Sequence, residues 1–190
     1  MRKLNAALFI SLDGVVEAPG GEPTLPEDRR GWSMRYTDDE VGQVIGAAMA
    51  ASDAMLLGRR TYADFAAYWP NVPEDDPFGA IMNNRTKYVV STTLDSVAWK
   101  NSHLIKGDIA GEIRRLKQGP GLDISVVGSG TLVRWLLQHD LLDELQLMLC
   151  PVVLGVGGRL FDGVDYMKSL KVLESRSFSS GMTFLRFGPE

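Results

Sequence analysis

The sequence predicts an α/β domain built around a mainly parallel β-sheet. Up to about residue 140, short apolar runs rich in β-forming residues alternate with helical patterns, which is typical of chains whose parallel strands are connected by helices. After that point only strand patterns follow, and Ser179-Ser180-Gly181 separates the last two strands as a hairpin turn. We therefore expect a parallel sheet with an antiparallel C-terminal edge.

Several segments have the composition and period of regular elements. The expected strands are residues 4–12, 54–57, 88–91, 124–127, 144–153, 171–178 and 183–187. The expected helices are residues 38–51, 61–68, 109–117 and 131–138. Two stretches rich in Pro, Gly and acidic residues, 19–31 and 69–78, are expected to be long surface loops.

The first helix has a local start signal. Thr37-Asp38-Asp39-Glu40 fits a capping box, in which the Thr37 and Glu40 side chains would each satisfy an exposed backbone amide.

Length and composition restrict the class of protein. A chain of 190 residues suits one domain, and we expect residues 1–190 to form one. Apolar residues make up 45% and charged residues 23%, which excludes a mostly disordered chain. The net charge of −4 argues against nucleic acid as the main ligand, because phosphate backbones are bound by basic surfaces.

The single cysteine, Cys150, excludes an intrachain disulfide and gives no sign of an oxidising compartment. It lies in the apolar run 145–153, so we interpret it as a small buried side chain rather than a reactive thiol. The first apolar stretch is interrupted early by Asp13-Gly14 and is too short for a secretory signal or a membrane span. We expect a cytoplasmic protein with no membrane contact.

The clearest chemical signal follows the second expected strand, in Leu57-Gly58-Arg59-Arg60-Thr61. In open parallel sheets, ligands bind at the carboxyl ends of strands, where helix N-termini present their amides. Gly58 would let the backbone approach a ligand, and Thr61 would cap the next helix. Arg59 and Arg60 would donate to phosphate oxygens. A helix N-terminus repels cations, so a bound anion explains this arginine pair better than solvent does.

Two further strand ends have small or hydroxyl-bearing residues. Val127 is followed by Gly128-Ser129-Gly130-Thr131-Leu132, which would expose amides beside a helix start. This is neither the dinucleotide fingerprint nor a Walker loop, and a plain glycine-rich turn is the alternative. Ser91-Thr92-Thr93 follows the third strand, with an ordinary turn as the alternative. Together the three turns would line one cleft for an anionic ligand.

The order of these motifs resembles the dihydrofolate reductase superfamily, beginning with Ser11-Leu12-Asp13-Gly14 after the first strand. The closer resemblance is to the branch that contains the C-terminal reductase domain of bifunctional riboflavin-biosynthesis proteins. Its further marks are Leu142-Asp143-Glu144-Leu145, Cys150-Pro151-Val152-Val153-Leu154-Gly155, Gly157-Gly158 and Leu160-Phe161. The resemblance covers essentially the whole chain. It implies a dihydrofolate reductase-like three-layer α/β fold, with helices on both faces of the sheet.

The resemblance also implies that the cofactor is NADPH. In this family the Gly-Arg-x-Thr turn and the Ser/Thr-ended strand hold the adenosine phosphate region, and the later glycine turn holds the pyrophosphate. The implied cofactor-binding residues are Gly58, Arg59, Arg60, Thr61, Ser91, Thr92, Gly128, Ser129, Gly130, Thr131 and Leu132. Arg59 and Ser91 would bind the 2′-phosphate, and the preference for NADPH over NADH rests on Arg59.

The implied reaction is hydride transfer to a C=N or C=O carbon of a small heterocycle, with a ribosylaminopyrimidine of riboflavin biosynthesis as the leading candidate. Asp13 would orient the substrate or donate a proton, or else is only a turn residue. Trp32 would stack on the substrate, or else is a packed core residue. Asp38 is a further substrate-binding candidate, with a helix-dipole role as its alternative.

The chain departs from the resembled branch in two ways. No single acid in residues 32–40 matches the buried acid that contacts the pterin in dihydrofolate reductases. A zinc-binding deaminase domain is missing, and with only His103 and His139 we assign no metal site. The alternatives are a reductase of another pterin-like or carbonyl substrate, a flavin in the same cleft, or a nucleotide-binding module without turnover. We expect a homodimer, with residues 144–153 and 155–158 at its interface.

Overall fold

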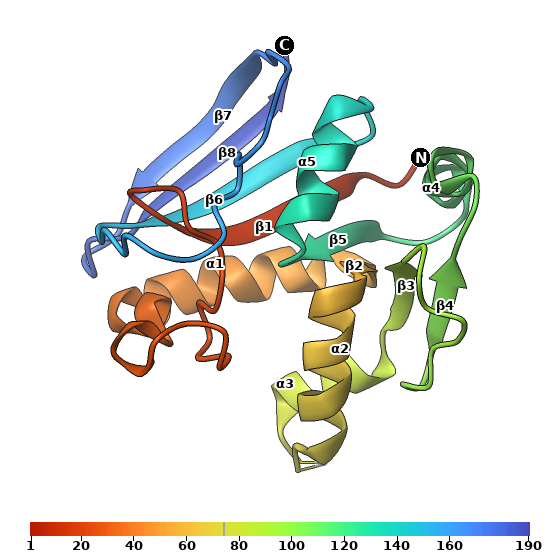
Figure 1. Ribbon diagram of the computed structural model, residues 1–190, viewed down its shortest axis with the longest axis horizontal. Coiled ribbons are helices and arrows are strands. Elements are labelled where there is room, and N and C mark those ends of the chain that lie inside the picture. The colour runs from red at the N-terminus through yellow and green to blue at the C-terminus, as the bar shows by residue number, and fades with distance from the viewer. Residues whose placement is uncertain (74) are drawn as a thin grey trace.

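The structure, a computed structural model, describes residues 1–73 and 75–190 (Figure 1). Its strands are β1 (Leu4–Ser11), β2 (Ser52–Gly58), β3 (Thr86–Val90), β4 (Ser102–Ile105), β5 (Asp123–Val127), β6 (Glu144–Cys150), β7 (Leu170–Ser177) and β8 (Thr183–Pro189). Its α-helices are α1 (Asp39–Ala50), α2 (Arg59–Tyr68), α3 (Pro77–Asn84), α4 (Ile109–Gln118) and α5 (Gly130–Gln138). Short 3-10 helices cover Glu27–Arg29, Trp32–Tyr36 and Trp69–Asn71.

The eight strands form one sheet in the order β4-β3-β2-β5-β1-β6-β8-β7. The six strands from β4 to β6 are parallel, and β8 and β7 add an antiparallel edge. Every strand of the parallel part therefore has its carboxyl end at the same edge of the sheet. The expected mainly parallel sheet with antiparallel C-terminal strands is confirmed.

Helices cover both faces of the sheet, as expected. On β1 the side chains of Leu4, Ala6, Leu8 and Ile10 share one core with α4 and α5. The helices α1, α2 and α3 pack on the opposite face, in two further cores (Figure 1). Within the described part of the chain, no helix combines the length and apolar character needed to cross a membrane.

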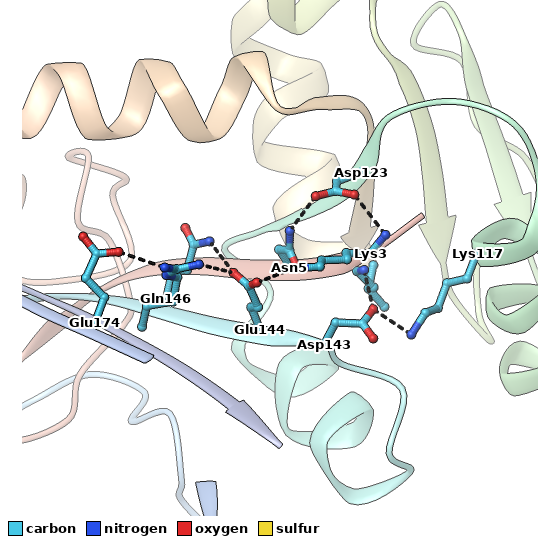
Figure 2. Close-up of polar contacts among 10 residues, drawn as sticks. Lys3, Asn5, Lys117, Asp123, Asp143, Glu144, Gln146 and Glu174 are labelled. Carbon is cyan, nitrogen blue, oxygen red and sulfur yellow. Dashed lines mark hydrogen bonds and ion pairs between the residues drawn. The ribbon is translucent and has the colours of Figure 1, made fainter. Parts of the chain in front are cut away.

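A polar network fixes β1 between its two neighbours at their amino ends (Figure 2). The Asp123 carboxylate accepts from the Lys3 amide at 3.0 Å and from Asn5 Nδ2 at 3.1 Å. Glu144 accepts from Lys3 Nζ at 2.9 Å and pairs with Arg186 at 3.4 Å. Burial alone would raise the pKa of Glu144, but the Lys3 and Arg186 contacts outweigh it and hold the pKa below its ordinary value. The network sets the register of β1 against both β5 and β6.

The capping box expected at the start of α1 is not observed. The N-cap of α1 is Asp38, whose carboxylate accepts from the Val41 amide at 2.9 Å. Thr37 instead donates its hydroxyl to the Ser33 carbonyl, and Glu40 pairs with Arg176 at 3.0 Å. The capping box is therefore replaced by a single aspartate cap at the residue after Thr37.

Several short elements were not predicted from the sequence. The stretch 69–78, expected to be a loop, holds the 3-10 helix Trp69–Asn71 and the first residues of α3; Glu74 lies outside the described residues. The short strand β4 pairs in parallel with β3. The other expected elements are confirmed, with ends shifted by a few residues. Cys150 is fully buried, and burial raises the pKa of its thiol to about 12, so the interpretation as an inert core side chain holds.

Candidate functional site

The candidate site is the carboxyl edge of the parallel strands. The turns that follow β3, β2, β5 and β1 stand side by side there, because these four strands are neighbours in the sheet. They are the turns at Ser91, Gly58, Gly128 and Asp13, in that spatial order. The structure therefore brings together four segments that are far apart in the sequence.

Two of these turns are joined by hydrogen bonds. Ser129 Oγ accepts from the Gly58 amide at 2.9 Å, and Thr61 Oγ1 accepts from the Ser129 amide at 3.1 Å. Ser129 Oγ also donates to the Val127 carbonyl at 3.2 Å. We call these three contacts the hydroxyl lock. The lock fixes the N-terminus of α2 beside that of α5, and the amides of both first turns lack intrahelical acceptors.

The lock corrects the role expected for Thr61. The helix α2 begins at Arg59 with Gly58 as its N-cap, and no side chain caps it. Thr61 lies in the first turn of the helix and binds Ser129, which is 68 residues away in the sequence. The partner was therefore outside the reach of a local interpretation.

Backbone geometry explains the glycine at position 128 but not the one at position 58. Gly128 has φ of +57°, and a Cβ there would lie 3.2 Å from Thr61 Oγ1 and Cγ2, so a side chain is disfavoured twice. Ser129 adopts the same left-handed region with φ of +59°. Gly58 has an extended conformation, and a Cβ there would make only ordinary contacts with Ser129. The backbone conformation at Gly58 therefore does not itself require a glycine.

The arginine pair lies at the start of α2. Arg59 and Arg60 are its first two residues, and both are exposed. Within the described residues neither side chain forms an ion pair or a hydrogen bond. Two unneutralised cations at a helix N-terminus repel the helix dipole, so this edge favours an anion.

The remaining cofactor candidates differ in what they can offer. Ser91 is buried, and its hydroxyl accepts from the Thr93 and Leu94 amides at 3.1 and 3.0 Å. Thr92 is exposed beside it. Gly130 and Thr131 open α5, while the Leu132 side chain is buried in the core, so only its amide can face the edge.

Asp13 is held in a dense set of contacts after β1. Its carboxylate accepts from Ser11 Oγ at 2.7 Å and from the Leu154 and Gly155 amides at 3.1 and 2.8 Å. Arg159 lies 3.5 Å away. Burial alone would raise the pKa of Asp13, but these hydrogen bonds outweigh it and lower the pKa to about 2. A carboxyl with this pKa is ionised at neutral pH, which disfavours proton donation and favours a positioning role.

The segment after β6 is tied to the β1 turn along its length. Arg159 Nε donates to the Asp13 carbonyl at 2.9 Å, and the Leu160 amide donates to the Gly14 carbonyl at 2.8 Å. Glu17 accepts from the Gly158 amide at 2.7 Å. These contacts, which nothing in the sequence pattern indicated, make the β1 turn and residues 152–160 one rigid wall of the site.

The two substrate-binding candidates both make structural contacts. Trp32 is only 3% exposed, packs in the core beneath α1, and donates its indole N–H to the Glu17 carbonyl at 2.9 Å. These contacts favour the packed core tryptophan of the two alternatives. Asp38 caps α1 and also accepts from Ser179 Oγ and the Ser180 amide, at 3.2 and 3.1 Å. Its carboxylate is therefore committed to structure, which explains why no substrate acid stood out here.

One feature was missed entirely. A cavity of about 190 Å³ lies against the 3-10 helix Trp32–Tyr36, and its lining includes the side chains of Arg29, Arg30 and Arg35 and the segment 152–154. The available signal was the three arginines within seven residues, inside and just after a stretch expected to be a surface loop.

Comparison with known proteins identifies the family of the chain. Residues 2–184 match the family model of the RibD C-terminal domain. The uncharacterized protein YyaP of Bacillus subtilis (strain 168) is 29% identical over 188 residues, which cover 95% of this chain and 92% of YyaP.

Among solved structures, a protein from Shewanella sp. PV-4 assigned to riboflavin biosynthesis superposes with a TM-score of 0.78 at 21% identity, covering 99% of each chain. The Thermotoga maritima diaminohydroxyphosphoribosylaminopyrimidine deaminase/5-amino-6-(5-phosphoribosylamino)uracil reductase superposes with a TM-score of 0.66 at 15% identity. The match covers 100% of this chain and 57% of the Thermotoga maritima chain. The expected dihydrofolate reductase-like fold is confirmed. The chain belongs to the RibD C-terminal domain family, a family of reductase domains.

Proposed function

We propose that this chain is an NADPH-dependent reductase that transfers a hydride to a small heterocyclic substrate. The observation that carries the proposal is the hydroxyl lock, which holds the N-termini of α2 and α5 side by side at the carboxyl edge. Two adjoining helix N-termini concentrate unpaired amides and positive partial charge, which suits the pyrophosphate of a dinucleotide.

The residues present fit such a cofactor. The amides of Gly130, Thr131 and Leu132, with Arg60, would hold the pyrophosphate. Arg59 would bind the 2′-phosphate that distinguishes NADPH from NADH. Since the Ser91 hydroxyl already accepts two amides, the exposed Thr92 is the better hydroxyl partner for that phosphate.

When bound, NADPH supplies the hydride, and the protein supplies position and electrostatics. On the side of the α5 turn away from α2, the wall is formed by the β1 turn with Asp13. Ionised Asp13 would orient the substrate indirectly, by fixing the Leu154 and Gly155 amides. A rigid wall here holds the reacting groups in register and limits access of water.

The substrate class follows from the family. The Thermotoga maritima protein is a 5-amino-6-(5-phosphoribosylamino)uracil reductase, and a ribosylaminopyrimidine is therefore the first substrate to test here. A homodimer remains a prediction; β6 lies between β1 and β8 and most of its side chains are already buried, which disfavours β6 as the interface. Sedimentation velocity would give the oligomeric state.

Calorimetric titration of NADPH and NADH into the protein and into Arg59→Ala tests the cofactor. Charge-assisted hydrogen bonds contribute about 1.5–3 kcal/mol, so Arg59→Ala is expected to bind NADPH roughly tenfold or more weakly, with little change for NADH. Arg114→Ala, an exposed arginine on α4, is the matched control and should bind both as the parent does. Equal weakening of both cofactors by Arg59→Ala would contradict the 2′-phosphate assignment.

NADPH oxidation with a panel of pyrimidine, pterin and carbonyl compounds tests the reaction. Turnover with a ribosylaminopyrimidine supports the proposed substrate, and turnover with only another class supports a different reductase. Tight NADPH binding without turnover on the whole panel would instead favour a nucleotide-binding module.

A further inference from the structure

The cavity beside the 3-10 helix Trp32–Tyr36 has a strongly basic lining. Arg29, Arg30 and Arg35 contribute three guanidinium groups, against the single carboxylate of Asp28. Arg29 is 3.7 Å from Asp28, whereas Arg30 and Arg35 form no ion pair within the part of the chain that the structure describes. The lining therefore has a net charge of plus two, in a protein whose overall net charge is −4. Such a local excess of positive charge favours a dianion.

The lining is not purely polar. Trp32, Tyr36 and the apolar segment 152–154 complete the cavity wall, and Val153 is 68% exposed there. An apolar surface beside arginines suits an anion that has a flat organic part, because guanidinium groups bind the acid and apolar atoms cover the rest. The cavity of about 190 Å³ limits the occupant to a small molecule.

This cavity shares residues 152–154 with the wall formed by the β1 turn and residues 152–160, but it contains none of the residues of α2 or α5 where the cofactor is proposed to bind. The segment at Leu154 runs between the cavity and the β1 turn, since its amide donates to Asp13 on one side and its carbonyl accepts from Arg29 on the other. The two hydrogen bonds are 3.1 and 2.8 Å long.

We propose that this arginine pocket is a second ligand site, which binds a small organic dianion. Its occupant competes with the Leu154 carbonyl for the Arg29 guanidinium, and this alters the peptide segment that the Asp13 carboxylate holds. The link from the pocket to the β1 turn therefore consists of two consecutive hydrogen bonds through a single residue. The inference does not depend on the reductase proposal, because the pocket shares no side chain with the proposed cofactor site.

Phenyl phosphate is a suitable probe, titrated into the ¹⁵N-labelled full chain and followed by backbone amide and indole resonances. We expect saturable shifts at the Leu154 and Gly155 amides and at the Trp32 indole N–H, with the Gly130 amide unchanged. Neutral benzyl alcohol at the same concentrations should leave all four unchanged. Shifts confined to Gly130 would mean that the probe binds at the carboxyl edge, and the proposal would be overturned.

Matched arginine variants separate the two sites. Arg35→Gln, at an exposed residue with no partner to lose among those described, is expected to weaken phenyl phosphate binding roughly tenfold or more. Arg29→Gln should weaken it as well and remove the shifts at Leu154. Arg59→Gln and Arg114→Gln should bind the probe as the parent does, and thermal unfolding confirms that each variant is folded.

The outcomes also distinguish this proposal from the reductase proposal. If the parent binds no NADPH but phenyl phosphate still shifts Leu154 in an Arg35-dependent way, the pocket stands and the cofactor assignment fails. If Arg59→Gln abolishes phenyl phosphate binding and Arg35→Gln does not, the pocket assignment is wrong. No saturable binding by the parent would also overturn it.

Discussion

Ser129→Ala tests whether the hydroxyl lock holds the two helix N-termini together. The substitution removes the acceptor of the Gly58 amide and the donor to the Val127 carbonyl. A typical hydrogen bond contributes about 0.5–1.5 kcal/mol, and an amide left without a partner costs about 1–3 kcal/mol. Because Ser129 is half-buried, we expect the free energy of unfolding to fall by about 1–3 kcal/mol.

Ser129→Gly removes the same hydroxyl but tolerates the backbone conformation better. Residue 129 has φ of +59° and ψ of +44°, where a residue with a Cβ is strained by about 1–2 kcal/mol. We therefore expect Ser129→Gly to be more stable than Ser129→Ala by about 1 kcal/mol, with the parent the most stable of the three.

Urea unfolding followed by circular dichroism measures all three proteins. Thr131→Ala is the matched control, since among the described residues this neighbouring exposed hydroxyl accepts only from Arg134, at 3.3 Å, and the variant should stay within about 0.5 kcal/mol of the parent. A parent-like Ser129→Ala, or a Ser129→Gly less stable than Ser129→Ala, would refute the reasoning.

Three further predictions concern titratable groups. The pKa of Glu144 is lowered in the folded state, so its ionised form stabilises the fold above its unfolded pKa. Glu144→Gln should therefore lower the free energy of unfolding by about 1–3 kcal/mol at pH 7. In acid unfolding titrations, this difference between parent and variant should vanish as the pH falls through the folded pKa of Glu144. Burial lowers the pKa of Lys87 to about 8, so between that pH and its unfolded value near 10.5 the unfolded chain binds more protons. The stability of the parent relative to Lys87→Met, measured in urea, should therefore rise by about 3 kcal/mol across this window, and a falling difference would contradict the sign. Asp13→Asn should speed hydrogen exchange at the Leu154 and Gly155 amides while NADPH affinity stays unchanged, whereas unaltered exchange would exclude the positioning role.

The carboxyl edge of the sheet could be predicted because its signals are local. Each turn directly follows an apolar strand, and parallel strands end at a common edge, so the order of motifs along the chain was enough to bring Arg59, Ser129 and Asp13 together. The roles of individual side chains could not be predicted in this way. Thr61 has the right spacing for a cap, but its partner is 68 residues away, and only the adjacency of β2 and β5 brings the two together.

The missed elements have different causes. β4 has only four residues, too few to show the alternation expected of a strand, and it is recognisable only by its pairing with β3. For α3 a signal was present: Asp76 precedes Pro77, and in the structure its carboxylate accepts from the Gly79 amide at 2.7 Å, as an N-cap does. The surrounding Pro and Gly residues favoured the interpretation as a loop. The roles of Trp32 and Asp38 could not be decided from the sequence. Trp32 is buried and donates to the Glu17 carbonyl, while the Asp38 carboxylate accepts from the Ser180 amide in the turn between β7 and β8.

The position of β1 has a consequence for how the protein is made. This strand leaves the ribosome well before both of its neighbours, because its partners lie more than a hundred residues later: Leu4 pairs with Ile124 in β5, and Asn5 pairs with Glu144 in β6. During translation an apolar strand therefore has unpaired edges until β5 and then β6 have been synthesised. Non-local pairing of this kind slows folding, and exposed strand edges promote aggregation. A nascent chain that stops before β6 cannot complete its central strand, so we expect C-terminally truncated chains to depend on chaperones or to be degraded.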